Sequence, residues 1–256
     1  MFRATSVDVK SPGEIAVMRE AGRIVAEVLE MLSQATLPGT TTLELDRLAE
    51  SEIRKRKAKP AFLGYRGFTH TLCASINEEV VHGIPSEKRV LREGDIIGLD
   101  LGCVVKGFYG DSAITVPVGK VTPKAQKLVD ITRASLAAGI DRMNQDNRLG
   151  DLGAAIQQRA ESAGFSVVRE FVGHGIGRSL HEDPPVPNYG ASGTGLRLRP
   201  GMVLAVEPML NAGGPEVRIL SDGWTAVTVD GSLSAHFEHT IVVTENGPEI
   251  LTRRED

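Results

Sequence analysis

Apolar residues recur at helical spacing early in the chain, and β-rich sequence follows them. The first periodic stretch opens at Ser11-Pro12-Gly13-Glu14, which has the form of a capping box with proline in the first turn, and it continues to about Leu32. The apolar positions of a second stretch are Leu43, Leu45, Leu48 and Ile53. The pattern therefore predicts two consecutive helices and then strands.

The same order returns in the second half of the chain. Thr122-Pro123 again supplies a cap and a proline, and the periodic pattern that follows ends at Asn147. Its apolar positions are Leu128, Ile131, Leu136, Ile140 and Met143. Those of the next helix are Leu149, Leu152, Ile156 and Ala160, and β-rich sequence follows again.

This repetition indicates an α/β fold of the α+β type, with helices packed on one face of a mainly antiparallel sheet. The two halves would span about 11–120 and 121–250, offset by roughly 110 residues. The alternative is that the halves share a common order of elements without being related. Since no linker separates them, we expect 1–256 to form a single domain.

A carboxylate interrupts one of the apolar runs, Gly98-Leu99-Asp100-Leu101-Gly102, which otherwise predicts a buried strand. Asp111 follows in the next strand, and Lys106-Gly107 between them suits a hairpin turn. With the turn centred between Val105 and Lys106, the two carboxylates would face each other. They would repel strongly unless a cation lay between them, so this hairpin predicts a divalent metal site.

Two further acids interrupt apolar strands in the second half. Glu207 ends the run Gly201–Val206 and precedes a proline, which favours extended backbone, and Glu238 opens a run of β-branched residues. Any one of these acids could lie on an edge strand and face water. Each of the four interruptions costs strand stability, however, so together they indicate a compensating ligand.

Three histidines add nitrogen groups to this set. His174 lies in Gly173-His174-Gly175, where small residues permit close approach of backbone and ligand. The glycines also resemble part of a nucleotide-binding loop, but the required strand–helix context is missing. His82 and His181 are further candidates. A lone histidine is more often structural, whereas one beside carboxylates is suited to metal ligation or acid–base chemistry.

Charge and cysteine content exclude several classes of function. Lys and Arg number 29 against 33 Asp and Glu, so the formal net charge of −4 offers no general field for nucleic acid or anionic membrane. The two cysteines, Cys73 and Cys103, support neither a disulfide framework nor a thiolate zinc site. No apolar run approaches the ~18–20 residues of a membrane span. We expect a cytoplasmic protein with no membrane partner.

Five of these residues, in their order and local sequence, resemble the metal ligands of the type I methionine aminopeptidases, above all the bacterial form: Asp100, Asp111, His174, Glu207 and Glu238. The likeness covers nearly the whole chain, through Asn77–Pro85, Gly173–Gly177, Val206–Met209 and Asp222-Gly223-Trp224. It implies the pita-bread fold, with two pseudo-symmetric halves. It also implies removal of the initiator methionine when the second residue is small, by a hydroxide bridging two divalent ions (Co, Mn, Fe or Zn).

The resemblance also implies roles for individual residues. Asp111 and Glu238 would bridge the two ions, Asp100 would bind one of them, and the other ligands would bind the second. Glu207 would relay a proton, His181 would stabilise the oxyanion, and His82 would contact the peptide nitrogen. The methionine pocket would be formed by Phe62, Tyr65, Phe68, Cys73, Leu180 and Trp224.

Two pocket positions depart from the family pattern, which has cysteine in place of Phe62 and phenylalanine in place of Leu180. Either residue could instead belong to ordinary core packing. The loss of an aromatic face at Leu180 puts the shape of the pocket in doubt. Because Phe2 is large, we also expect the enzyme to leave its own Met1 in place.

The resemblance implies a monomer that acts on nascent polypeptides and small peptides with N-terminal methionine. The basic run Arg54–Lys59 raises the prospect of transient ribosome association, but we favour a solvated helix end, where the helix dipole attracts cations. Two alternatives for the function remain: a prolidase-like dipeptidase, and a module of the same fold that binds peptides without cutting them.

Overall fold

The computed structural model describes residues 7–253, so Phe2 lies outside the described residues. Four α-helices appear where the apolar periodicity predicted them: α1 (Pro12–Ala35), α2 (Thr42–Lys55), α3 (Pro123–Ile140) and α4 (Leu149–Glu161). The capping box at Ser11 is confirmed, because its hydroxyl accepts a hydrogen bond from the Glu14 N–H and the Glu14 carboxylate accepts one from the Ser11 N–H. A second capping box, at Thr41, opens α2.

The expected end of α3 was wrong. The helix stops at Ile140 rather than at Asn147, and Met143 lies in the turn that follows. Met143 is nevertheless fully buried, in the same core cluster as the α3 side chains. Its apolar character therefore comes from packing and not from a place in the helix.

The central sheet has nine strands, and every pairing in it is antiparallel. Seven form the path β1-β4-β5-β14-β9-β7-β8, while β2 pairs with β4 and β15 with β14. Their bounds are β1 (Lys59–Pro60), β2 (Leu72–Ile76), β4 (Ile96–Val105), β5 (Phe108–Pro117), β7 (Gly173–Gly175), β8 (Glu182–Val186), β9 (Val203–Val206), β14 (Glu238–Thr244) and β15 (Gly247–Ile250).

Two three-stranded sheets complete the fold. The first has the order β13-β10-β6 and the second β11-β12-β3. Their bounds are β3 (Glu79–Val81), β6 (Ser166–Val167), β10 (Met209–Asn211), β11 (Val217–Ile219), β12 (Ala226–Thr228) and β13 (Ser234–His236). A short 3₁₀ helix, η1 (Tyr65–Gly67), lies between β1 and β2.

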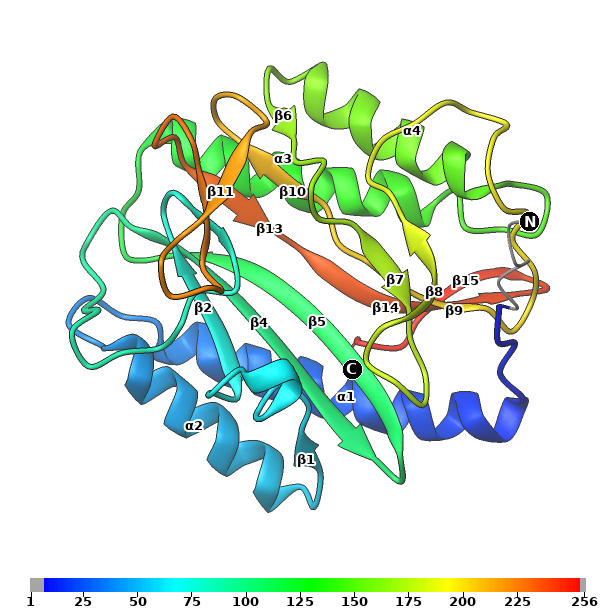
Figure 1. The fold of residues 1–256 in the computed structure, drawn as a ribbon, viewed down its shortest axis with the longest axis horizontal. Helices are drawn as coiled ribbons and strands as arrows, with labels where there is room; N and C mark the ends of the chain where they lie inside the picture. The colour runs from blue at the N-terminus through cyan, green and yellow to red at the C-terminus, as the bar shows by residue number, and fades with distance from the viewer. Residues whose placement is uncertain (1–6, 254–256) are drawn as a thin grey trace.

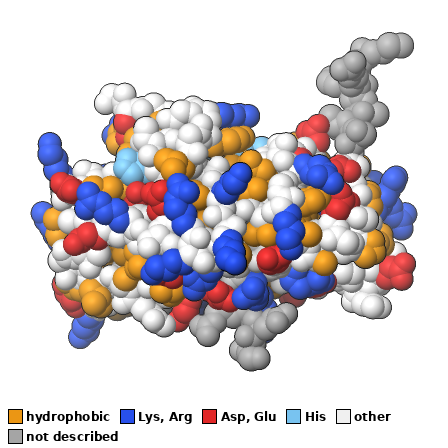
Figure 2. All heavy atoms as spheres, turned by 90° about the horizontal axis from the view of Figure 1, so that it is seen from below, with side chains coloured by type: hydrophobic (Ala, Val, Ile, Leu, Met, Phe, Trp, Pro, Cys, Tyr) orange, Lys and Arg blue, Asp and Glu red, His pale blue; other side chains and the backbone are white. Residues whose placement is uncertain are grey.

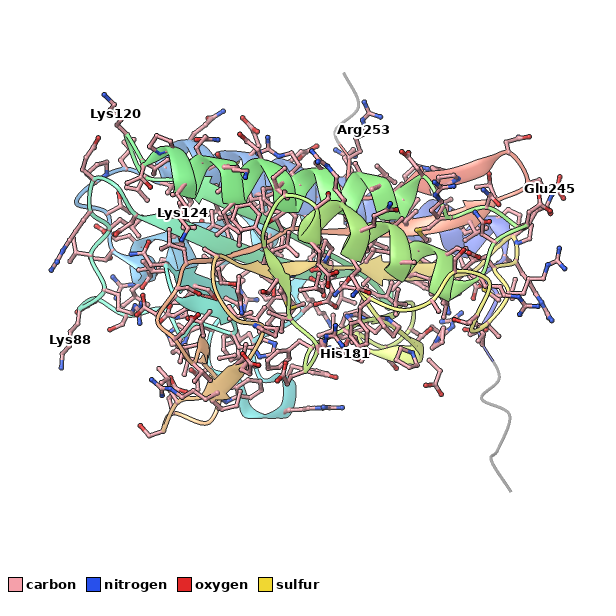
Figure 3. The ribbon with its side chains drawn as sticks, turned by 90° about the horizontal axis from the view of Figure 1, so that it is seen from above. Lys88, Lys120, Lys124, His181, Glu245 and Arg253 are labelled. Carbon is pink, nitrogen blue, oxygen red and sulfur yellow. The ribbon has the colours of Figure 1, made fainter. Side chains whose placement is uncertain are left out.

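The helices cover one side of the curled sheet. In the face view, α1 and α2 lie along its first half and α3 and α4 along its second half (Figure 1). Seen from above, the helices lie along one side of the molecule and His181 lies on the opposite side (Figure 3). One core cluster joins α1 and α2 to β2 and β4, and another joins α3 and α4 to β9 and β14. The mixed α/β fold with a mainly antiparallel sheet is therefore confirmed.

The β4–β5 hairpin turns one position later than expected. Lys106 and Gly107 both have positive φ, 47° and 82°, as a two-residue type I′ turn requires, and Val105 pairs with Phe108. Asp111 consequently lies opposite Gly102, and the two aspartates are not directly opposite each other. The offset is an even number of residues, so both side chains still project from the same face of the sheet as diagonal neighbours.

The basic run ends α2 as predicted for a helix C-terminus. Arg54 pairs with Glu50, while Arg56 pairs with both Glu27 and Glu52. The surface that contains α2 shows basic and acidic side chains interspersed, with no large region of one sign (Figure 2). None of the helices in residues 7–253 combines the length and apolar composition needed to cross a bilayer.

Candidate metal centre and adjoining pocket

Three carboxylates meet at the middle of the sheet. Asp100 lies on β4 and Asp111 on the neighbouring β5, while Glu238 is the first residue of β14 and pairs with Ala113 of β5. Three adjacent strands thus bring acids from distant parts of the sequence to one place. Gly102 leaves the space they need, because a Cβ there would lie 2.9 Å from the Phe62 ring and 3.3 Å from the Asp111 carboxylate.

His174 and Glu207 join this group from the other half of the sheet. His174 is the middle residue of β7 and pairs with Ala205 of β9. Glu207 does not lie inside its apolar strand as expected, because β9 ends at Val206 and Pro208 follows. Its Oε1 atom lies 3.5 Å from Nε2 of His174. The two side chains are therefore adjacent.

The orientation of His174 leaves one ring nitrogen free. Its Nδ1 lies 2.9 Å from the carbonyl oxygen of Gly175, which can only accept a hydrogen bond, so Nδ1 carries the proton. The flanking glycines permit this arrangement, since a Cβ at Gly173 or Gly175 would collide with a backbone oxygen of a neighbouring strand. Nε2 of His174 is then an unprotonated nitrogen, as a metal ligand must be.

The donor set fits divalent cations. Ligand atoms of Asp111, His174 and Glu238 all lie within 4.8 Å of one another, and all three residues are buried. One carboxylate oxygen of each of Asp100, Asp111 and Glu238 is inaccessible to water and has no hydrogen-bond partner. Unpaired buried carboxylate oxygens are costly unless a cation neutralises them, and oxygen with imidazole nitrogen suits several divalent metals.

The acids in this cluster resist ionisation in the absence of metal. Burial raises the pKa of Asp111 to about 7. Burial, and then repulsion from Asp111, holds the pKa of Asp100 and that of Glu238 well above their usual range. Burial likewise raises the pKa of Glu207, with repulsion from Asp100 as the next cause. The cluster therefore favours a state in which positive charge is supplied from outside.

A cavity of about 140 Å³ adjoins the cluster. The structure places every site residue expected from the sequence on its wall: the five acid and imidazole groups, His82, His181, Phe62, Tyr65, Phe68, Cys73, Leu180 and Trp224. Phe62 and Leu180 are buried in one apolar cluster with Phe68 and Cys73. The two departures from the family pattern thus line the cavity and also pack in the core.

The two remaining histidines occupy different parts of the cavity. The ring of His82 packs edge-on against Phe171 and Trp224, and burial lowers its pKa to about 4. The ring of His181 lies 4.2 Å from that of His174, and its Nδ1 is 2.8 Å from the hydroxyl of Tyr65. Both imidazoles are therefore held beside the metal cluster as neutral groups above about pH 6.5.

Two residues near the site escaped sequence reasoning. Arg66 lines the cavity. The pKa of His181 is lowered first by the partial burial of its ring and second by the positive charge of Arg66. His236 is buried, with its Nε2 atom 3.8 Å from Oε2 of Glu207. Neither lies in a motif. In the loop that contains Arg66, Gly64 and Gly67 have positive φ, and so does Arg66 itself, at 48°. The proximity of His236 to the acids depends on pairing between distant strands.

Comparison with known proteins connects this arrangement to a family. The profile of metallopeptidase family M24 matches residues 16–245. Methionine aminopeptidase 1 of Bacillus subtilis is 53% identical over 244 residues, which cover 95% of this chain and 98% of the relative. The crystal structure of methionine aminopeptidase from Thermotoga maritima has a TM-score of 0.96 and 49% identity, and the match covers 98% of this chain and all of that one.

The likeness to a prolidase concerns the fold. The prolidase from Pyrococcus furiosus has a TM-score of 0.77 and 21% identity, and the match covers 97% of this chain but 66% of the prolidase. The aminopeptidases, in contrast, match over nearly their whole length at about half of all positions. This chain therefore belongs to the methionine aminopeptidases of metallopeptidase family M24.

Proposed function

We propose that this chain removes the initiator methionine from nascent polypeptides, and from small peptides, when the second residue is small. The observation that carries the proposal is the junction of two environments in one cavity. An apolar wall that includes Phe68, Cys73 and Trp224 continues directly into the buried cluster of unpaired carboxylates. Aromatic and sulfur-containing side chains suit a methionine side chain, and the cluster suits hydrolysis.

The proposed metal ligands are the five residues of the cluster. Asp111 and Glu238 would be shared between two divalent ions, with Asp100 on one side and His174 and Glu207 on the other. Four carboxylates balance the charge of two such ions. When bound, the ions supply an activated water and polarise the scissile carbonyl. Co, Mn, Fe and Zn all suit this donor set.

The protein side chains position the peptide and move the proton. The apolar wall holds the methionine side chain and excludes water from it. His82 would contact the nitrogen of the scissile peptide, and His181, held through Nδ1 by Tyr65, would present Nε2–H to the oxyanion. Glu207, itself one of the five cluster residues, would carry the proton to the leaving amine. The free α-amino group of the substrate would bind at the metal site, which would confine cleavage to the N-terminal residue.

We further propose that 1–256 forms one catalytic domain, built from related halves of about 11–120 and 121–250. The two successive helix pairs, each followed by strands of the shared sheet, support this division. The two unpaired thiols fit a cytoplasmic protein, and we propose that this protein is a monomer. In the basic run Arg54–Lys59, the first three side chains pair with Glu50 and Glu52 of α2, which favours a solvated helix end over a transient contact with the ribosome.

The direct test compares two substrates with and without metal. We expect the metal-loaded protein to release methionine from Met-Ala-Ser and to leave an Ala-Pro dipeptide intact, while chelated protein releases nothing. Amino acid analysis over time measures both reactions. Cleavage of Ala-Pro alone would favour the dipeptidase, and binding of Met-Ala-Ser without turnover would favour the non-catalytic module.

Substitution can show whether His82 and His181 act in catalysis or as metal ligands. His82→Ala and His181→Ala should each lower kcat/KM for Met-Ala-Ser by about 10²-fold or more, the range for acid–base and oxyanion groups. Bound metal, measured by elemental analysis, should stay at the unmutated level. His70→Ala is a control, since His70 does not line the cavity. Loss of metal in His181→Ala would show that His181 is a ligand instead.

A further inference from the structure

His236, the last residue of β13, is held rigidly by the neighbouring strand β5. Its backbone N–H donates to Oγ1 of Thr115 over 2.9 Å, and the same hydroxyl donates to the carbonyl of His236 over 2.8 Å. The side chain is buried, with 3% of the residue exposed. The backbone of His236 is therefore fixed by Thr115 of β5, and its imidazole is shielded from solvent.

The Nε2 atom of His236 lacks a hydrogen-bond partner although water cannot reach it. Across from it lies Glu207, with Oε2 at 3.8 Å, while Oε1 of Glu207 lies 3.5 Å from Nε2 of His174. The Glu207 carboxylate is thus placed between two imidazoles. A buried polar nitrogen is costly when unpaired, so its alignment with a carboxylate indicates a partner in the working protein.

The carboxylate of Glu207 determines which ring nitrogen of His236 must carry a proton. An imidazole has an N–H on at least one of its two ring nitrogens. If only Nδ1 carried a proton, the lone pair of Nε2 would face the carboxylate and repel it. The geometry therefore favours the proton on Nε2, directed at Glu207.

We propose that His236 is a positioning residue for Glu207, donating from Nε2–H to Oε2 so that Oε1 remains directed towards His174 and the metal cluster. A small rotation of either side chain completes the contact. This inference rests on the proposed role of Glu207 as ligand and proton carrier. Groups that orient a ligating carboxylate typically change metal affinity or activity by ~10–100-fold when removed.

Three variants test the donor. His236→Leu removes the N–H with little change in volume, His236→Gln retains an amide N–H, and Ser234→Ala alters a buried residue of the same strand. We expect calorimetric titration with Mn²⁺ to give roughly 10–100-fold weaker binding for His236→Leu. With Met-Ala-Ser, kcat should fall while KM changes little. His236→Gln should recover most of both quantities, and Ser234→Ala should match the unmutated protein.

Two results would overturn the inference. Unchanged Mn²⁺ affinity in folded His236→Leu would show that Glu207 needs no donor at this position. Equal losses in His236→Gln and His236→Leu would show that shape and not the N–H matters. If the unmutated protein binds Mn²⁺ but His236→Leu behaves identically, only the positioning role fails; if the unmutated protein binds none, the proposed metal function fails with it.

A measurement on the unmutated protein covers the case in which His236→Leu does not fold. In protein labelled with ¹⁵N-histidine, the ring signals of His236 are those missing from the His236→Gln spectrum. We expect them to report the Nε2–H tautomer at pH 7.5 in protein loaded with Zn²⁺, a diamagnetic ion that leaves these signals visible. The Nδ1–H tautomer would overturn the proposal without reference to activity.

Discussion

Glu238→Gln should abolish both turnover and the stabilisation that metal gives. The substitution keeps the size of a side chain that is 2% exposed, but it replaces the proposed shared anionic ligand with a neutral amide. We expect kcat/KM for Met-Ala-Ser to fall by at least about 10³-fold, since metal-ion catalysis contributes several kcal/mol. The metal-free variant should melt at a higher temperature than metal-free unmutated protein, because one source of repulsion with Asp111 and Glu207 is gone.

Glu238→Gln should thus raise the melting temperature of the metal-free protein and remove the stabilisation by metal. These opposite effects distinguish a metal ligand from an acid with a structural role. A structural glutamate would lose stability on substitution in the presence and in the absence of metal. The matched control is Glu249→Gln on the adjacent strand β15, where the carboxylate is partly exposed and pairs with Arg19. Its effect should stay within about 0.5 kcal/mol. If Mn²⁺ raised the melting temperature of Glu238→Gln as much as that of the unmutated protein, Glu238 would not be a ligand.

Sequence alone was sufficient for elements whose signals are local. The capping box at Ser11 and the cap-proline pair at Thr122 mark helix starts through contacts within four residues. The end of α3 was missed because the buried Met143 continues the helical apolar pattern after the helix has stopped. Apolar periodicity reports which side chains are buried, and it does not require that they share one helix.

The register of the hairpin required backbone information that composition does not give. A turn centred one position earlier was equally compatible with the apolar pattern, because both registers keep the same side chains on the same face. The positive φ angles of Lys106 and Gly107 decide between them. The sequence still indicated that Asp100 and Asp111 belong to one site, because a carboxylate in a buried apolar strand needs a compensating partner in either register.

The site residues that sequence reasoning missed depend on long-range pairing. His236 reaches Glu207 only because β13 joins β10 and hydrogen-bonds to β5 through Thr115. Nothing in the local sequence of Ser234–His236 differs from that of an ordinary buried strand. A histidine of this kind becomes visible only through its unpaired nitrogen in the folded structure.

Removing metal from the unmutated protein should produce the largest change in stability. Four neighbouring acids lose their counter-charge, so we expect metal-free protein to be less stable than saturated protein by at least ~2–3 kcal/mol. For a chain of this size the melting temperature should fall by roughly 4–12 °C. Calorimetry with Mn²⁺ and with chelator, after elemental analysis has verified metal removal, measures the difference. An identical melting curve would contradict the metal centre.

The pH dependence of the metal-free protein gives this prediction a definite sign. Above about pH 7.5, roughly one unit over the ordinary imidazole pKa, histidines of the unfolded chain bind few protons and contribute little. Unfolded carboxyls are then fully ionised, whereas burial raises the folded pKa of Asp111 to about 7 and that of Glu238 well above its usual range. The folded state therefore binds more protons than the unfolded state, and stability should fall as pH rises from about 7.5 to about 8.5.

Metal reverses this trend, because the ligands bind cations in their ionised forms and protons compete with the metal. The difference in melting temperature between Mn²⁺-loaded and chelated protein should consequently widen from about pH 7.5 to about pH 8.5. Glu238→Gln, with one fewer acid of raised pKa, should show a shallower decline when metal-free. If the difference in melting temperature stayed constant across this range, metal binding would not displace protons from the buried acids at the centre of the sheet.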